Sequence, residues 1–563
     1  MKSIGLPIWA ALALILSPVP VAHAAGPNAV LEAVPGDAWG VVLVRNLADV
    51  DKKLMGFSQA INSPMAGMSP LMMAKGMLGL FAGVDDNEGL ALVVMPMSSP
   101  EDFENKAALL IPTNNYDELL STMQPAEAVE GISQVTFQGN PSFVAKKGKF
   151  AVFGPSADAV KAVVAGEGNV AKQMTPHQLE RMGTDDLTLW VNLGAATQSE
   201  MVGGLLGMLE GMGAGSSAET IRAFQSAQIS VRFGPKGIDL GFYGNAKPGT
   251  PMAEAIKGTK APAGSLLAGL PAEDYILAAG SVTSAQGAKL LESYVDQASA
   301  GMAMTMDPEM AGAMSKLLGI CKGLVGGIRS MGFSINALPE EAEGMVSATA
   351  VIGLDGAAPG FVKSIGELYN AATVELGEEH ATKIKSALSF SADGERAAKL
   401  TLNAAELGAD EEDLGIMTKV FGAEGLVFRF AAVDDKHVAV TFGGGQAHAD
   451  AVAKLVQGGQ APLTADPGIQ KMAASAPAKR VSETYFSASN LMGLAKRIGE
   501  AVGDPLPFEL GPVESPVTVY SFVTPDGGSQ GDLIVPAELI KAVMQAVMAQ
   551  MGAGNAPPSS PPM

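Results

Sequence analysis

The chain has 563 residues, with 37 Lys and Arg against 58 Asp and Glu, so its formal net charge is −21. An acidic excess of this size repels phosphate backbones and anionic lipid headgroups, which argues against nucleic-acid binding and against electrostatic docking on membranes. Cys321 is the only cysteine, which excludes an internal disulfide and any metal site built from several cysteines.

Residues 1–24 have the pattern of a cleavable secretory signal peptide. Lys2 supplies the positive charge, residues 8–16 form an apolar run, and Ala22 and Ala24 give the small-x-small cleavage pattern. The run is shorter than the roughly 20 residues that span a bilayer, so a membrane anchor is the weaker interpretation. Cleavage between Ala24 and Ala25 predicts a periplasmic or extracellular chain with a net charge of −22 and no integral membrane span.

One pattern recurs four times along the chain: an apolar strand, a polar joint, and a helix that leads into a region rich in Gly, Met and Ala. The four strand segments are residues 38–47, 187–193, 275–282 and 484–491. Because the copies match in register, they indicate internal duplication.

A second pattern occurs twice and consists of a hairpin, a short helix that ends in Gly, and a linker that contains Pro. The copies are residues 149–181 and 437–471, and both contain the tract Ala-Asp-Ala-Val. Together with the cluster of Pro248, Pro251 and Pro262, the patterns predict two related halves, at residues 25–262 and 263–551.

Apolar and polar residues alternate in two pairs of segments, residues 229–233 with 238–242 and residues 428–430 with 438–442. This alternation predicts antiparallel hairpins with one solvated face. Residues 537–551 predict an amphipathic helix. We therefore expect an α+β fold: two related halves of antiparallel sheets, amphipathic helices packed on one face, and helical insertions rich in Met and Gly. The Pro-rich tail, residues 552–563, is predicted to be disordered.

The sequence lacks the common catalytic motifs: an H-E-x-x-H zinc motif, a G-x-S-x-G nucleophile elbow and a G-x-x-x-x-G-K-[ST] phosphate loop. His177, His380, His437 and His448 are the histidines of the predicted mature chain. His448 and Asp450 lie near the start of a short predicted helix, where a cap or a solvated surface is the simpler interpretation. We assign no catalytic, cofactor-binding or metal-binding residues, and we expect neither enzymatic activity nor a cofactor.

Three other features also have simpler structural interpretations. The acidic clusters at residues 85–89 and 410–413 could offer oxygens to Ca²⁺, but neither has the EF-hand spacing. The triple glycine at residues 443–445 follows a predicted strand and precedes a helix, as an anion-binding loop would, yet it lacks the dinucleotide-binding spacing. Cys321 lies in an apolar helical stretch, which favours a buried role over a reactive thiolate.

Methionine is unusually frequent, with 30 residues in the chain. Three clusters contain many of them: residues 65, 68, 72, 73 and 77; residues 201, 208 and 212; and residues 302, 304, 306, 310 and 314. Thioether side chains can line a pocket for an apolar ligand, form an adaptable interface or bind Cu(I). Filling the core of loosely packed helices is the simpler interpretation.

Residues 107–120 and 143–156 resemble a group of uncharacterised exported proteins of planctomycete-type bacteria. The resemblance covers roughly the first half of the chain. It implies an envelope protein without an established activity, and it transfers no functional residues.

The leading hypothesis is an exported, non-catalytic binding or structural protein of the bacterial envelope, with an envelope protein or an apolar small molecule as its partner. The first alternative is a carrier that holds an apolar ligand in a groove lined by the Met-rich helices. The second alternative is a hydrolase that uses carboxylates from distant segments, which spacing in the sequence cannot exclude.

Overall fold

The computed structural model describes residues 28–554, except for residues 81, 100–101, 138, 212–214, 306–307, 377 and 505–509. The chain forms two compact units. The first comprises Met1–Ala253 and Thr524–Lys541, and the second comprises Glu254–Val523 and Ala542–Met563. The chain passes from the first unit to the second after Ala253, close to the predicted boundary at residue 262. It returns to the first unit at Thr524–Lys541, and the sequence repeats do not predict this return. The predicted signal peptide, residues 1–24, and residues 555–563 of the predicted tail lie outside the described residues.

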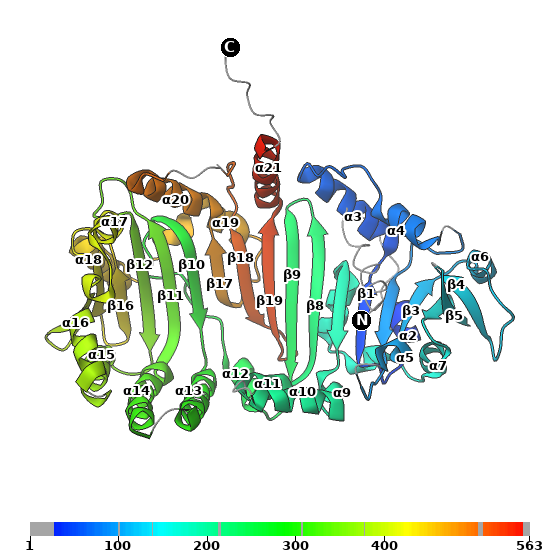
Figure 1. The fold of residues 1–563 in the computed structure, drawn as a ribbon, viewed down its shortest axis with the longest axis horizontal. Coiled ribbons are helices and arrows are strands. Elements are labelled where there is room, and N and C mark those ends of the chain that lie inside the picture. Colours follow the sequence, from blue (N-terminus) through cyan, green and yellow to red (C-terminus); the bar gives the residue numbers. More distant parts are fainter. Residues whose placement is uncertain are drawn as a thin grey trace, which may run out of the picture. The chain divides into compact units, whose positions relative to one another are not determined.

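The first unit contains an antiparallel sheet with the strand order β4-β5-β6-β3-β2-β1-β7-β8-β9-β19 (Figure 1). Its strands are β1 (Gly40–Val44), β2 (Leu90–Val94), β3 (Ala107–Pro112), β4 (Ile132–Phe137), β5 (Asn140–Lys147), β6 (Phe150–Gly154), β7 (Leu187–Val191), β8 (Phe224–Gly234), β9 (Gly237–Ala246) and β19 (Ser529–Pro536). Its helices are α2 (Asn28–Ala33), α3 (Leu47–Ala60), α4 (Pro70–Leu78), α5 (Phe103–Lys106), α6 (Tyr116–Ser121), α7 (Ala157–Ala165), η2 (Val170–Gln173), α8 (Pro176–Thr184), α9 (Leu193–Ala196), α10 (Glu200–Gly211) and α11 (Gly215–Ala223).

The second unit contains an antiparallel sheet with the strand order β13-β14-β15-β16-β12-β11-β10-β17-β18. Its strands are β10 (Asp274–Val282), β11 (Ile328–Ala337), β12 (Val346–Leu354), β13 (Leu388–Asp393), β14 (Ala397–Leu402), β15 (Leu426–Ala432), β16 (His437–Phe442), β17 (Arg480–Phe486) and β18 (Val517–Val523). Its helices are α13 (Ala285–Thr305), α14 (Pro308–Gly326), α15 (Ala358–Glu375), α16 (Glu378–Ala387), η3 (Ala405–Leu407), α17 (Glu411–Phe421), α18 (Gly445–Gln457), η4 (Pro462–Ala465), α19 (Pro467–Ala473) and α20 (Ala488–Val502). Two helices, α12 (Pro251–Gly258) and α21 (Ala537–Gly554), contain residues of both units.

The predicted α+β class with antiparallel sheets is confirmed. The four strand segments of the first repeat pattern form β1, β7, β10 and β17, which pair in each sheet as β1 with β7 and β10 with β17. Both predicted hairpins are present, as β8 with β9 and β15 with β16. The strand order β6-β3-β2-β1-β7-β8 of the first unit therefore corresponds to β16-β12-β11-β10-β17-β18 of the second.

Helices cover both faces of the first unit's sheet. Val41 and Leu43 of β1 pack with residues of α2, α7 and α8 in one hydrophobic cluster. Val44 of the same strand packs with residues of α3 and α4 in another cluster. Because neighbouring residues of a strand point to opposite faces, the two clusters lie on opposite sides of the sheet. The alternating hairpins predict helices on one face only, whereas the continuous apolar runs of β1 and β2 are typical of strands buried on both faces. Within the described part of the chain, none of the helices combines the length and apolarity needed to cross a bilayer.

Candidate functional site

Strand β8 places three polar residues inside the protein and an apolar residue outside. Ser226, Gln228 and Ser230 are only 1–2% exposed, whereas the intervening Ile229 is 42% exposed. On the neighbouring strand β9, Phe242 pairs with Ile229 and is 47% exposed. The hairpin prediction is correct, but the solvated face carries apolar side chains. Polar side chains are usually exposed and apolar ones usually buried, so a buried polar face and an exposed apolar face are the features that need an explanation.

Helix α8 explains why the polar face of β8 is buried. The Gln178 amide donates to the Ser226 hydroxyl at 3.1 Å, and the Arg181 guanidinium donates to the Ser230 hydroxyl at 3.0 Å. Arg181 also pairs with Asp532 of β19 at 3.2 Å. The helix therefore packs on this part of the sheet through hydrogen bonds and ion pairs, which requires small polar side chains beneath it.

Two consecutive aspartates connect this polar layer to the other face of the sheet. Asp185 pairs with the Arg181 Nε at 2.6 Å, and the adjacent Asp186 pairs with the Lys53 Nζ of α3 at 2.6 Å. Both aspartates are at most 1% exposed. Burial raises the pKa of Asp532, while the positive charge of Arg181 opposes that rise. These carboxylates are paired with cations at a packed interface, which is the arrangement of a structural network.

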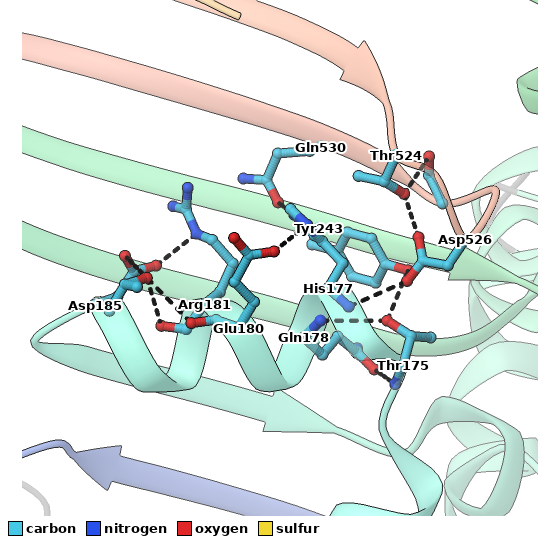
Figure 2. A network of polar contacts seen from close by, with 12 residues as sticks. Thr175, His177, Gln178, Glu180, Arg181, Asp185, Tyr243, Thr524, Asp526 and Gln530 are labelled. Atoms are coloured by element: carbon cyan, nitrogen blue, oxygen red, sulfur yellow. Dashed lines mark hydrogen bonds and ion pairs between the residues drawn. The ribbon is translucent and has the colours of Figure 1, made fainter. Parts of the chain in front are cut away.

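A second group of contacts fixes the start of α8 (Figure 2). Thr175 and Gln178 form a reciprocal capping box. The Tyr243 hydroxyl donates to Asp526 Oδ2 at 3.2 Å, and the His177 backbone N–H donates to the same oxygen at 3.4 Å. Burial raises the pKa of Tyr243 to about 12. Burial also raises the pKa of Asp526, but hydrogen bonds from surrounding donors outweigh it and hold that pKa below its ordinary value.

These pKa shifts bear on the hydrolase alternative. A carboxylate hydrolase needs one protonated acid beside one ionised base in a cleft open to substrate. Asp526 stays ionised and Tyr243 stays protonated near neutral pH, and both are engaged in hydrogen bonds that hold α8. Asp532 has the raised pKa of a general acid, but it is only 8% exposed and is paired with Arg181. The network therefore supports packing better than acid–base catalysis.

An unbroken row of apolar residues crosses the face of the first unit's sheet that bears Ile229. Each member is the registered partner of the next, from β6 across β3, β2, β1, β7 and β8 to β9. The row consists of Phe153, Leu109, Leu92, Val42, Leu189, Ile229 and Phe242, and its first five members are half-buried. At about 4.8 Å between strands, it extends over roughly 29 Å. We call these residues the first apolar row.

The second unit has the same feature on the equivalent strands. A registered row runs from β16 across β12, β11, β10 and β17 to β18. Five of its six members are apolar, namely Val440, Ala350, Phe333, Ala279 and the exposed Val519, and the polar Thr484 lies between the last two. We call these residues the second apolar row. Several of its immediate neighbours in the strands are again buried and polar, namely Ser334, Thr349, Thr441, Glu483 and Thr518. The equivalent strands of the two units thus both carry a registered row that is partly exposed.

Exposed methionines occur close in sequence to the start of the first sheet. Met65, Met68, Met72, Met73 and Met77 are 41–70% exposed, so the interpretation of this cluster as core filler is wrong. Met208 of α10 is also exposed. In Figure 1, α3 lies toward one end of β8 and β9, and α9, α10 and α11 lie toward the other end. The side chains of Met302, Met304 and Met306 lie outside the described part of the structure.

His448 occupies an unexpected position in the second unit. Its Nδ1 lies 3.1 Å from Glu273 Oε1, and its Nε2 lies 3.1 Å from the Thr349 hydroxyl. A carboxylate, an imidazole and a hydroxyl that contact one another in this order are the components of a nucleophilic triad. However, Thr349 is 0% exposed in the middle of β12. A substrate cannot reach this hydroxyl, so the contacts serve to satisfy buried polar groups.

The remaining sequence candidates have structural roles. Asp86 pairs with Lys75, Glu88 pairs with Lys149, and Asp410 caps α17 by accepting hydrogen bonds from two backbone N–H groups. The triple glycine makes the turn into α18, and a Cβ built on Gly445 would approach the Glu343 carboxylate, whose negative charge disfavours an anion there. Among the described residues, no group of three or more His, Cys, Asp or Glu is arranged to hold a metal ion. His380 lies on the exposed surface of α16, His437 pairs with Asp434 at 2.7 Å, and Cys321 is half-buried.

Comparison with known proteins gives little further guidance. No protein-family model and no curated protein matches the chain. Two solved structures of TP0453 match weakly. Crystal form IV has a TM-score of 0.21 and 9% identity and covers 38% of this chain and 79% of that one. Crystal form I has a TM-score of 0.20 and 11% identity and covers 40% and 81%. Scores this low support no conclusion about fold or function.

Proposed function

We propose that this chain is a non-catalytic, exported binding protein of the bacterial envelope, and that each of its two apolar rows binds an elongated apolar ligand. The observation that carries the proposal is the first apolar row, which crosses seven strands in register and ends in the exposed Ile229 and Phe242. Export rests on the signal-peptide pattern of residues 1–24 and on the resemblance to exported planctomycete-type proteins.

Exposed apolar side chains in a regular strip are costly in water. Ile229 and Phe242 are registered partners on two paired strands, so covering them with a ligand costs the protein little conformational entropy. The polar face beneath α8 is hydrogen-bonded and buried. Helices α3 and α4 cover the opposite face around Val44, but Ile229 and Phe242 remain exposed there for binding, and the acidic net charge favours a neutral ligand over an anionic one.

The test uses the neutral apolar dye N-phenyl-1-naphthylamine and the double variant Ile229→Ser/Phe242→Ser. We expect saturable dye binding to the wild-type chain and at least about tenfold weaker binding to the variant, because both removed side chains bury apolar area worth a total of about 3 kcal/mol or more. Leu407→Ser is the matched control, since Leu407 is exposed but lies in η3, outside either row. Equal dye affinity of the wild-type chain and the double variant would contradict the proposal.

Native mass spectrometry of the chain purified from its own host provides a second test. An apolar ligand retained by the wild-type chain and lost from the double variant is the expected result. Hydrolysis products accumulating during incubation with esters or glycosides would instead support an enzyme.

A further inference from the structure

Strand β13 is the outermost strand of the second unit's sheet, and among the described strands it pairs only with β14. The outer strand of the first unit's sheet, β4, has its free edge covered by the preceding loop. There the Ala126 N–H donates to the Gln134 carbonyl at 2.8 Å, and the Thr136 N–H donates to the Met123 carbonyl at 3.0 Å. In the described part of the chain, no such backbone hydrogen bond reaches the outer edge of β13. A bare edge of this kind can pair with another strand.

The pairing with β14 shows which backbone groups of β13 point outward. Just before the strand begins, the Ala387 carbonyl accepts from the Asn403 N–H at 2.7 Å. In an antiparallel strand, alternate residues bond to the same neighbour, so the N–H and C=O groups of Phe390 and Ala392 point away from β14. The free edge therefore offers donors and acceptors at two positions.

Strand β13 is held in place and has few of the features that usually protect an edge. The Phe390 ring stacks on Tyr369 of α15 with centroids 5.7 Å apart, and the Tyr369 hydroxyl donates to the Leu388 carbonyl at 3.1 Å. Natural edge strands are often protected by Lys, Pro or a bulge. The sequence of β13 has neither Lys nor Pro, and its pairing with β14 is regular. The strand is thus already in the conformation that a further strand requires.

The charges at the two ends of β13 indicate what pairs with it. Lys385 lies in the last turn of α16, directly before the strand, whereas Asp393 ends the strand and Glu395 follows it. All three are exposed, and within the described residues none of them forms an ion pair. An antiparallel copy of β13, with Phe390 opposite Ala392, brings the acidic end of each strand to the basic end of the other. The edge is therefore complementary to itself.

We propose that β13 pairs with β13 of a second copy of this chain, antiparallel about a two-fold axis at Ser391. Each copy donates hydrogen bonds from the Phe390 and Ala392 N–H groups and accepts two at the carbonyls of the same residues. Lys385 of each copy then lies near Asp393 and Glu395 of the other. Because β13 contributes to neither apolar row, the dimer and the proposed apolar ligand can be tested separately.

Sedimentation velocity of the full mature chain over a series of concentrations tests the proposal. We expect a weak, reversible dimer, because two short strands bury less than the roughly 1,200 Å² of a stable interface. Ala392→Pro should weaken the dimer at least about tenfold, since it removes an outward N–H from each copy and leaves the bonds to β14 intact. Ala392→Thr keeps the N–H and is the matched control, which should dimerise like the wild-type chain.

An exchange of charges tests the antiparallel direction without a proline. Lys385→Glu and Glu395→Lys should each weaken the dimer about three- to tenfold, because each turns two symmetry-related attractions into repulsions. The variant with both substitutions should recover the wild-type affinity, which a loss of folding would not allow. A double variant that dimerises no better than the single ones would contradict the antiparallel pairing.

Hydrogen exchange followed by mass spectrometry locates the contact. The amides of residues 388–393 should exchange more slowly as the chain concentration rises, and Ile229→Ser/Phe242→Ser should dimerise like the wild-type chain. A chain that is still monomeric at about 0.1 mM would overturn the proposal. So would a dimer in which these amides are unprotected, equal dimer affinities for Ala392→Pro and Ala392→Thr, or protection that requires an unrelated extended peptide.

Discussion

The Arg181 Nε lies 2.6 Å from Asp185 Oδ2, one turn further along α8, and the same guanidinium reaches Asp532 and Ser230 on the sheet. One arginine thus neutralises two buried carboxylates and bonds a buried hydroxyl. Removing one partner from such a network leaves the others charged and desolvated, which costs more than the network contributes when complete.

Arg181→Met should therefore destabilise the first unit by about 3–5 kcal/mol. Urea unfolding, followed by the fluorescence of the buried Trp190, would measure the loss. Lys161→Met is the control, because Lys161 pairs with Glu130 on the exposed surface at 3.0 Å and such pairs contribute little. The assignment fails if the two variants unfold at the same urea concentration.

Asp526 and Asp532 should respond to acid in opposite directions. The pKa of Asp526 is lowered in the folded chain, so its contribution to stability is present above the ordinary pKa of 3.8 and is lost as the pH falls through the lowered value. The pKa of Asp532 is raised, so its contribution is present below 3.8 and is lost as the pH rises through the raised value.

The measurement compares Asp526→Asn and Asp532→Asn with the wild-type chain from pH 7 to pH 3 by thermal unfolding. The stability advantage of the wild-type chain over Asp526→Asn, about 1 kcal/mol at pH 7 because this carboxylate is largely exposed, should shrink with acid. Its stability relative to Asp532→Asn should increase with acid. Parallel trends for the two variants would refute the assigned directions.

Much of the fold is predictable from local patterns. The central strands β1, β7, β10 and β17 follow from repeated apolar runs, and the β8–β9 hairpin follows from its alternation and the turn at Gly234 and Gly237. These local patterns do not predict which helices cover each face of the sheets. Alternation shows that Ile229 and Ser230 point to opposite faces, but not which face a distant helix will cover.

The candidate sites show the same limit. The tract Ser226-Ala-Gln-Ile-Ser230 becomes a buried polar face because α8, some fifty residues earlier, brings Gln178 and Arg181 onto it. The signal that the sequence offers for this contact is a helix with Gln and Arg three residues apart. Likewise, the hydrogen bond between Glu273 and His448 joins residues that are 175 positions apart in the sequence. The exposure of Met73 and Met77 depends on Leu71 and Ala74 taking the buried side of α4, since all four are apolar.

The Thr349 hydroxyl should be inert despite its contact with His448. A fluorophosphonate probe, which labels activated hydroxyl nucleophiles, should not modify it, because the residue is fully buried. Thr349→Val should instead destabilise the second unit by about 1–3 kcal/mol, since it leaves the His448 Nε2 buried without its partner. Mass spectrometry of the probe-treated chain and urea unfolding provide the readouts. Labelling that disappears in Thr349→Val would establish a nucleophile and refute a purely structural role.

The turn before α18 should tolerate no side chain at Gly443. This residue has a φ of +71°, and a Cβ built on it would lie 2.2 Å from the Val346 carbonyl oxygen. Gly459, with a φ of +58°, has open space around the same position and provides the matched control. Gly459→Ala should cost about 1–2 kcal/mol, the usual cost of a left-handed alanine. Gly443→Ala should cost more, because β12 must also move away from the new methyl group. Equal urea midpoints for the two variants would show that β12 yields without cost and that backbone conformation alone selects glycine at this turn.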